Sequence, residues 1–534
     1  MDHLYQPYSS VRNTVFARKG MVATSQPLGA QAGLEILQKG GNAIDAAIAT
    51  AAALTVVEPT SNGIGGDAFA LVWVNGQLYG LNGSGPAPAA ISIEAVKAKG
   101  YERMPKFGVI PITVPGVPSA WIELSKRFGK LPFKELFSPA IRYAKEGFPL
   151  TPVLGKYWKL AYARFKEALK GEQFNPWFDT FAPNGKAPDI GEMWSSPGHA
   201  ATLTSIAETN AESFYRGELA EKIVEFIQKY DGFLTKEDLE NYRAEWVDPI
   251  STNYRGYDVW EIPPNGQGLL ALMALNIVSG FDFTEKDTID TYHKQIEAIK
   301  LAFTEAKEVI TDQKHMKISA DYLLSDEFAH INRLRINDKA ITPEPVQQPS
   351  GGTVYLATAD AEGNMVSFIQ SNYMGFGSGI VIPGTGIGLQ NRGFDFSLER
   401  AHANALLPGK KCYHTIIPGF LTKGNEAIGP FGVMGGFMQP QGHFQVVMST
   451  VDFHLNPQAA LDAPRWQWVD GKKVMVEPHF PNHLVQALIR KGHQIQVTSD
   501  TGGFGRGQII WRNPQTGVLI GGTESRTDGA IAAW

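Results

Sequence analysis

One segment of this 534-residue chain constrains the fold more than any other, because it is apolar on nearly every side. Residues 42–57 begin with Asn42, a good N-cap, and carry Asp45 in the first turn, which predicts a helix. Its body reads AIDAAIATAAALTVV, and a helix without a polar face is buried within a large protein. The run is also shorter than a membrane-spanning helix requires. We therefore expect a central helix that other elements cover on all sides.

Turns and strands follow this helix. Residues 58–67 read EPTSNGIGGD, a glycine-rich turn that leads into a strand, AFALVWV, and Asn75-Gly76 then marks a hairpin before QLYGLNG. Residues 115–330 are mostly helical in pattern, whereas the part after residue 352 is rich in glycines and strands, with one helix near 481–492. The pattern indicates a helix-rich first part and a strand-rich second part.

The composition excludes several classes of protein. The formal net charge is −5 and no long run of lysine or arginine occurs, which argues against a nucleic-acid partner or a basic membrane patch. The one cysteine, Cys412, can form no intrachain disulfide, and the twelve histidines lack metal-ligand spacing, so we expect neither a metal nor another cofactor. No apolar stretch of about 18 residues occurs and the N-terminus lacks the apolar core of a secretory signal. We expect no membrane association and a cytoplasmic location.

A polar segment separates the two parts of the chain. The region 335–352, which includes INDKAITPEPVQQPSGG, is rich in proline, glutamine and glycine. This composition predicts an exposed, flexible linker. The linker ends where an expected strand begins, at Thr353.

A β-hairpin is expected directly after the linker. Residues 353–359 and 365–371 have the pattern of strands, and DAEGN between them has the pattern of a turn. If the hairpin is symmetric about Glu362, Thr353 faces Ser371, and the two hydroxyls lie side by side. A shift of one residue in the register would separate them.

Such a placement has a chemical use. A threonine hydroxyl is a weak nucleophile unless a base lies beside it. If the bond before Thr353 is cut, the new α-amino group, with a pKa of about 7.7–8.0, can act as that base near neutral pH. On the pattern alone, a threonine that simply begins a strand after a loop remains the commoner explanation.

Four long segments resemble the γ-glutamyltransferase (glutathione hydrolase) family. They are GGNAIDAAIATAAALTVVEPTSNGIGGDAFALV, GGTVYLATADAEGNMVSFIQSNYMGFGSGI, LQNRGFDFS and GVMGGFMQPQGH. The similarity extends from about Lys19 to the C-terminus and is strongest to the glutathione hydrolase-like and cephalosporin acylase-like proenzymes. It implies an α+β fold, a four-layer αββα sandwich of the N-terminal-nucleophile hydrolase type. It also implies self-cleavage into a large subunit, 1–352, and a small subunit, 353–534, which together form one catalytic unit.

The resemblance assigns roles to individual residues. Thr353 stands where the family's nucleophile begins the small subunit, and Ser371 stands where a second threonine hydrogen-bonds the nucleophile. Gly435 and Gly436 match the glycine pair whose N–H groups hold the oxyanion, a role that small residues permit. Asp395 matches the aspartate that holds the α-amino group of the substrate.

Several positions depart from the family pattern. The arginine that grips the substrate's α-carboxylate would fall near Ile93, where the sequence has none, and Tyr373 replaces an asparagine that contacts the same group. Arg392 replaces a glutamine, and His414-Thr415 replace two serines. An arginine fork gives carboxylate recognition its geometry, so the departures weaken the case for γ-glutamyl binding. Arg392 could replace the missing arginine, or it could be a surface residue paired with Asp395.

The expected function is hydrolysis or acyl transfer through an ester on Thr353, without a cofactor. γ-Glutamyl amides such as glutathione are the first substrate class, and another N-acyl amide, cephalosporin acylase-like or oxamate-like, is the alternative. A different class is an uncleaved, inactive homologue that binds a small acidic ligand. A polyglutamate-processing enzyme is disfavoured by the lack of a signal sequence. The short FSLERAHANA segment predicts an open cleft, and a homodimer of processed heterodimers is a further possible assembly.

Overall fold

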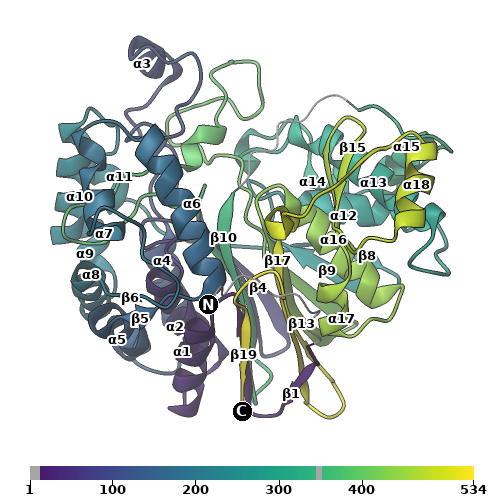
Figure 1. The fold of residues 1–534 in the computed structure, drawn as a ribbon, viewed down its shortest axis with the longest axis horizontal. Helices are drawn as coiled ribbons and strands as arrows, with labels where there is room; N and C mark the ends of the chain where they lie inside the picture. The colour runs from purple at the N-terminus through teal and green to yellow at the C-terminus, as the bar shows by residue number, and fades with distance from the viewer. Residues whose placement is uncertain (1–11, 344–350) are drawn as a thin grey trace.

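The computed structural model describes residues 12–343 and 351–534. Within these residues, two seven-stranded sheets form the centre of the molecule (Figure 1). Sheet A has the order β1 (Val15–Ala17), β18 (Leu519–Thr523), β17 (Arg506–Arg512), β13 (Glu426–Met434), β12 (Gly419–Lys423), β9 (Tyr257–Glu261) and β8 (Ile250–Tyr254). Sheet B has the order β19 (Ala530–Ala533), β2 (Gly20–Thr24), β10 (Gly352–Asp360), β11 (Met365–Tyr373), β3 (Asp67–Val74), β4 (Gln77–Gly83) and β7 (Glu245–Val247). Neighbouring strands of both sheets run antiparallel.

The two sheets share an apolar core. Phe69 and Tyr355 of sheet B and Phe420 of sheet A belong to one buried cluster. Because alternate residues of a strand point to opposite faces, Leu356 of sheet B and Phe431 of sheet A point away from this cluster. They enter two further clusters, which helices complete. The chain is therefore an α+β protein, as the family resemblance implied.

Helices cover the outer face of each sheet, on the left and on the right of Figure 1. The cluster beside sheet B includes α1 (Pro27–Gln38), α2 (Ala43–Val57), α3 (Ile93–Ala98), α4 (Val117–Phe128), α5 (Ser138–Glu146), α6 (Pro152–Ala168), α7 (Asn175–Phe181), α8 (Pro197–Glu208), α9 (Glu212–Arg216), α10 (Glu218–Lys229) and α11 (Lys236–Glu240). The cluster beside sheet A includes α12 (Gly268–Val278), α13 (Ile289–Lys307), α14 (Ala320–Leu323), α15 (Asp326–Arg335), α16 (Met438–Val451), α17 (Pro457–Asp462) and α18 (Asn482–Arg490). Smaller strands are β5 (Phe148–Pro149), β6 (Met193–Trp194), β14 (Trp466–Asp470), β15 (Lys473–Val476) and β16 (Gln494–Val497).

The apolar helix predicted over residues 42–57 is confirmed as α2, and all 15 of its residues are buried. Asn42 and Asp45 form a capping box, in which each side chain accepts a hydrogen bond from the backbone of the other. The helix packs against α1 and α5 on one side and against β10 and β11 on the other. None of the helices in the described parts of the chain is long and apolar enough to cross a membrane.

The hairpin register is the predicted one over most of its length. Val354 pairs with Gln370 and Ala359 pairs with Met365, which is the pairing of a hairpin symmetric about Glu362. A bulge lies between Gly352 and Val354, so Gly352 pairs with Tyr373.

The linker expectation is wrong for Ala340 and Ile341, whereas Asn337, Asp338 and Lys339 are exposed, as expected. Ala340 is buried, and its N–H donates to the carbonyl oxygen of Lys491 at 2.8 Å. The N–H of Ile341 donates to Glu297 Oε2 at 2.9 Å. Buried polar partners thus fix a segment whose composition is that of a loop. Residues 344–350, the middle of the expected linker, lie outside the described residues.

Candidate active site

The hydroxyls of Thr353 and Ser371 meet, as the hairpin register predicted. Thr353 Oγ1 donates to Ser371 Oγ at 3.0 Å, and both side chains are buried. Ser371 Oγ in turn donates to the carbonyl oxygen of Gly352 at 2.7 Å and accepts from the N–H of Tyr373 at 2.8 Å. Ser371 therefore connects the Thr353 hydroxyl to the carbonyl of the peptide bond that precedes Thr353.

The same row continues into the next strand. Ser371 pairs directly with Asp67, the first residue of β3. Residues opposite each other on antiparallel strands point to the same face of the sheet. Tyr355, Ile369 and Phe69, two residues further along these strands, face the core between the sheets. Thr353, Ser371 and Asp67 thus form a polar row at the end of that core.

Gly435 and Gly436 form the turn between β13 and α16. Their φ angles of +143° and +59° lie in the region that favours glycine. Gly436 lies close to the chain that leads into Thr353. A Cβ atom on Gly351, two residues before Thr353, would be only 3.4 Å from Gly436 Cα. The turn also precedes the N-terminus of a 14-residue helix, where partial positive charge favours an anion. This position fits the predicted oxyanion role, which stays a prediction.

Glycine is also required immediately before Thr353. A Cβ atom on Gly352 would lie 2.9 Å from the backbone nitrogen of Gly375, closer than van der Waals contact allows. The chain can therefore enter the site at this point only with a residue that lacks a side chain.

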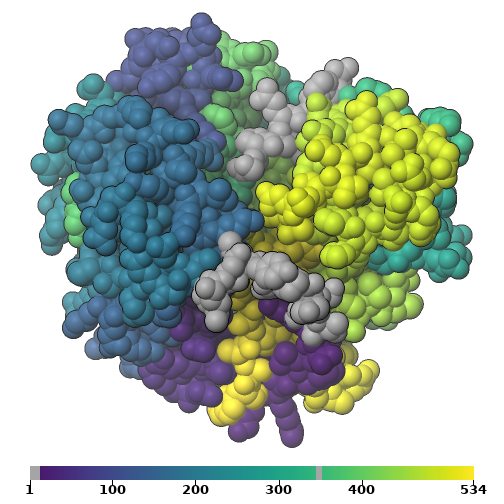
Figure 2. Space-filling model, viewed as in Figure 1, coloured from purple at the N-terminus to yellow at the C-terminus, as the bar shows by residue number. Residues whose placement is uncertain are grey.

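The segment that contains Gly505 and Arg506 lies against the glycine turn and also contacts α6. Gly505 lies against Gly435, and the guanidinium of Arg506 stacks 4.4 Å from the ring of Tyr157 on α6. Figure 2 shows a hollow in the surface between the blue region around α6 and the yellow C-terminal region.

Arg392 is a buried residue, which contradicts the expectation that it could be a surface arginine. It lies in a short helix, η4 (Arg392–Asp395), and is 1% exposed. Its guanidinium stacks 4.0 Å from the ring of Tyr373, and Nη1 donates to Thr415 Oγ1 at 2.9 Å. The closest oxygens of Asp67 and Asp395 are 4.0 and 3.9 Å away.

Tyr373 connects the nucleophile to Asp395. Its hydroxyl donates to Asp395 Oδ1 at 2.7 Å, while its N–H holds Ser371. Tyr373 adopts a φ of +75°, which costs a non-glycine residue energy and persists only where surrounding contacts hold it. Burial raises the pKa of Asp395, and the nearby charge of Arg392 opposes this rise.

His414 and Asp67 form a buried pair. His414 Nδ1 accepts from the N–H of Ile416 at 3.3 Å, so the proton lies on Nε2, which donates to Asp67 Oδ2 at 3.0 Å. Burial lowers the pKa of His414 well below its ordinary value, so this histidine is neutral. Burial raises the pKa of Asp67 to about 7, although the charge of Arg392 favours its ionised form.

Three residues that complete this cluster were assigned no role from the sequence. Asp67 ends the glycine-rich turn EPTSNGIGGD, and Asn265 and Gln267 lie in the turn PPNGQG before α12. Gln267 Nε2 donates to the carbonyls of Thr415 and Gly436 at 2.6 and 2.9 Å, so it joins the two segments that flank the site. A polar residue inside a glycine-rich turn was the only signal available in the sequence.

The segments expected near the substrate lie as follows. Ile93, near which the family arginine was expected, begins α3 and is buried in the apolar core, so it is not part of the polar cluster. The short segment after Asp395 is tied down by Asn404, which donates to the carbonyl oxygen of Asp395 at 2.8 Å.

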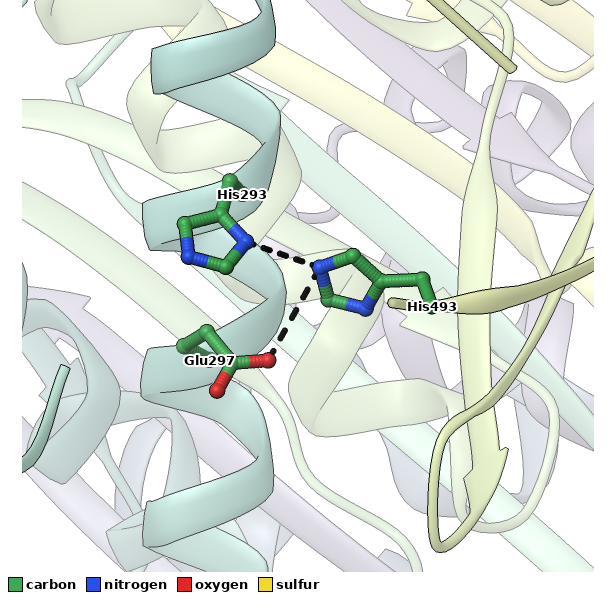
Figure 3. A group of neighbouring side chains, drawn as sticks. All are labelled: His293, Glu297 and His493. Carbon is green, nitrogen blue, oxygen red and sulfur yellow. Dashed lines mark hydrogen bonds and ion pairs between the residues drawn. The ribbon is translucent and has the colours of Figure 1, made fainter. Parts of the chain in front are cut away.

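A second polar cluster offers a possible set of metal ligands. His293 and Glu297 on α13 and His493 present donor atoms within 4.8 Å of one another (Figure 3). Imidazole and carboxylate groups suit several divalent metals.

The hydrogen bonds of this cluster do not fit a metal. His293 Nε2 donates to the carbonyl oxygen of Asn337, so His293 Nδ1 must accept from His493 Nε2, 2.8 Å away. His493 Nδ1 then faces the ammonium of Lys300 at 3.4 Å, and that ammonium also donates to Glu297. Both imidazole lone pairs already face a donor, and the Glu297 carboxylate accepts from Lys300 and from the N–H of Ile341. The cluster therefore ties residues 337–341 to α13 and to the loop before β16.

Comparison with known proteins agrees with this geometry. The family model of gamma-glutamyltranspeptidase matches residues 29–534. The chain is 36% identical to the glutathione hydrolase-like YwrD proenzyme of Bacillus subtilis, over 97% of this chain and 99% of the relative. It is 33% identical to the oxamate amidohydrolase proenzyme of Klebsiella pneumoniae, over 96% and 98%.

A solved structure is more similar still. The cephalosporin acylase from Bacillus halodurans is 67% identical, covers 99% of this chain and 98% of its own, and superimposes with a TM-score of 0.97. These similarities agree with the motifs around Thr353 and with the cluster that the fold gathers there. The chain is an enzyme that belongs to the gamma-glutamyltranspeptidase family.

Proposed function

We propose that this chain is a self-processing amidohydrolase that cuts its own Gly352–Thr353 bond and then uses Thr353 as an N-terminal nucleophile. The observation that carries the proposal is the position of Ser371, whose hydroxyl bonds both Thr353 Oγ1 and the carbonyl oxygen of Gly352. The names of the relatives, which are proenzymes, support processing. The two sheets between helical layers support a four-layer αββα architecture.

Maturation begins with attack by Thr353 Oγ1 on the carbonyl carbon of Gly352. The hydroxyl proton passes toward Ser371, whose own hydrogen bond polarises the carbonyl under attack. The C–N bond breaks, the threonine nitrogen takes a proton, and Gly352 is left as an ester on the hydroxyl. Water then hydrolyses the ester, which gives a carboxylate on Gly352 and a free α-amine on Thr353.

Turnover repeats the same steps on an external amide. The α-amine takes the hydroxyl proton, the oxygen attacks the substrate carbonyl, and the N–H groups of Gly435 and Gly436 stabilise the oxyanion. The leaving amine takes the proton from the α-ammonium. Water or another amine then resolves the acyl ester and frees Thr353.

The substrate class that fits best is an amide whose acyl part carries a carboxylate. Arg392 is held in place by Tyr373 and Thr415, and its Nε and Nη2 atoms have no hydrogen-bond partner among the described residues. A buried guanidinium with open donors recognises a carboxylate with two parallel bonds. γ-Glutamyl amides and dicarboxylyl amides both belong to this class, and oxamate, which a relative's name contains, does as well.

A panel of three substrates tests this assignment. KM is measured for glutathione, for a dicarboxylyl monoamide and for a neutral acyl amide, with wild type and with Arg392→Gln. We expect Arg392→Gln to raise KM about ten- to a hundredfold for the two carboxylate substrates and to change it little for the neutral amide. Equal effects on all three substrates would contradict the assignment of Arg392.

A further inference from the structure

Asp67 belongs to the polar row with Thr353 and Ser371, and it also lies beside Arg392, which we propose binds the carboxylate of the substrate. It pairs with Ser371 across the sheet and is fully buried. Its Oδ2 accepts from His414 Nε2 at 3.0 Å. No part of the catalytic scheme above uses this carboxyl group, although a buried carboxyl is costly to retain.

The open edge of Arg392 faces this carboxyl group. Nη1 is engaged by Thr415, whereas Nε and Nη2, which together form one two-pronged edge, lack partners in the parts of the chain that the structure describes. Nε lies 4.0 Å from Asp67 Oδ2, just beyond hydrogen-bond distance. Stacking on Tyr373 fixes the plane of the guanidinium, so a small movement of Asp67 is enough to close the gap.

The groups around Asp67 shift the pKa of its carboxyl group in opposite directions. Burial raises its pKa to about 7, and Arg392, Lys411 and the N–H groups of Gly85 and Gly116 oppose that rise. His414, which donates to Asp67, is neutral. The phenols of Tyr215 and Tyr242 also sense the charge of Asp67, and burial raises the pKa of both, so they stay protonated. A pKa of about 7 places the change of charge of Asp67 near neutral pH.

We propose that Asp67 is a positioning residue that competes with the substrate for Arg392. Neutral Asp67 leaves the Nε–Nη2 edge to the substrate's carboxylate, whereas ionised Asp67 closes on that edge and occupies it. The affinity for carboxylate-bearing amides then falls as pH rises, while neutral amides do not sense the change. This inference rests on the proposed role of Arg392.

The test is the ratio of KM for a dicarboxylyl monoamide to KM for a neutral acyl amide, measured from pH 6 to pH 8.5. The ratio is used because titration of the Thr353 α-amine affects both substrates and cancels. We expect the ratio to rise about tenfold across this range in wild type, the effect of one competing charged hydrogen bond. In Asp67→Asn, which keeps an oxygen for His414, we expect the ratio to be low and independent of pH.

The control is Glu245→Gln, because Glu245 is an exposed carboxylate paired with Lys411 at 2.7 Å. It should retain the wild-type rise. A ratio independent of pH in wild type would overturn the proposal even if Asp67→Asn failed to fold, and so would an undiminished rise in Asp67→Asn. If Arg392→Gln affects both substrates equally, the proposed substrate class fails. If Arg392→Gln is selective but the wild-type ratio is flat, only the role of Asp67 fails.

Discussion

The hydroxyl of Ser371 lies between the hydroxyl of Thr353, at 3.0 Å, and the carbonyl that Thr353 must attack. The expected threonine nucleophile is therefore already hydrogen-bonded in the uncut chain.

Ser371→Ala should slow both maturation and amide turnover about tenfold, because one hydroxyl hydrogen bond contributes about 0.5–1.5 kcal/mol. The measurements are the rate of precursor loss on a denaturing gel and kcat on a neutral amide. The matched control is Ser367→Ala, on the same strand, where the hydroxyl bonds Tyr355 at 2.8 Å instead. Wild-type rates in Ser371→Ala would show that this hydroxyl has no catalytic part.

We expect the Gly436→Ala variant to mature roughly tenfold or more slower than wild type and to hydrolyse amides more slowly by a similar factor. A Cβ atom at a φ of +59° costs about 1–2 kcal/mol and shifts the turn whose N–H groups meet the oxyanion. Gly384→Ala is the control for strain alone, since Gly384 has a φ of +70° and open space around an added Cβ. Both variants should lose similar stability, and comparable activity in the two would argue against an oxyanion role.

Activity on a neutral amide should rise with pH between about 7 and 9, because the base is an α-amine with an ordinary pKa of about 7.7–8.0. The measurement is kcat/KM against pH for the mature enzyme. A profile that follows a group near pH 4, with no rise above neutrality, would point to a carboxylate base instead.

The histidine cluster should make the fold sensitive to acid. Burial lowers the pKa of His493 to about 2, below its unfolded value of about 6.5, so the unfolded chain binds the extra proton first. Stability is therefore fully present above pH 6.5 and is lost as pH falls, by about 2 kcal/mol at pH 5. Guanidinium unfolding of the Thr353→Ala precursor with and without His493→Gln measures this difference.

His315→Gln serves as the control for this experiment, because the His315 side chain is 42% exposed. It should leave the loss of stability between pH 7 and pH 5 unchanged. The same loss in the His493→Gln precursor would show that the cluster does not carry the acid sensitivity.

The parts of the site that depend on local pattern could be predicted from the sequence. The N-cap at Asn42 and the apolar body after it determine α2, and the hairpin turn around Glu362 determines the register that joins Thr353 to Ser371. The motif resemblance located Gly435 and Gly436, and the structure places this turn beside Gly351. Their catalytic roles stay predictions.

The parts that depend on tertiary packing could not be predicted. Arg392 is three residues from Asp395, which suggested a surface pair, but the fold buries its side chain against Tyr373 and Thr415. Asp67 reaches the site because β3 pairs with β11, a contact between residues about 300 positions apart. The composition of the expected linker likewise did not indicate that the buried side chain of Glu297 on α13 accepts a hydrogen bond from the N–H of Ile341.

The measurement that tests the central claim most directly is the intact mass of the purified protein after incubation, with N-terminal sequencing of the smaller product. We expect two fragments, residues 1–352 and 353–534 of the chain, with the smaller one beginning at Thr353. Thr353→Ala should remain a single chain, because no hydroxyl is left for the acyl shift. A wild-type chain that stays whole, or a cut at any other bond, would contradict the account.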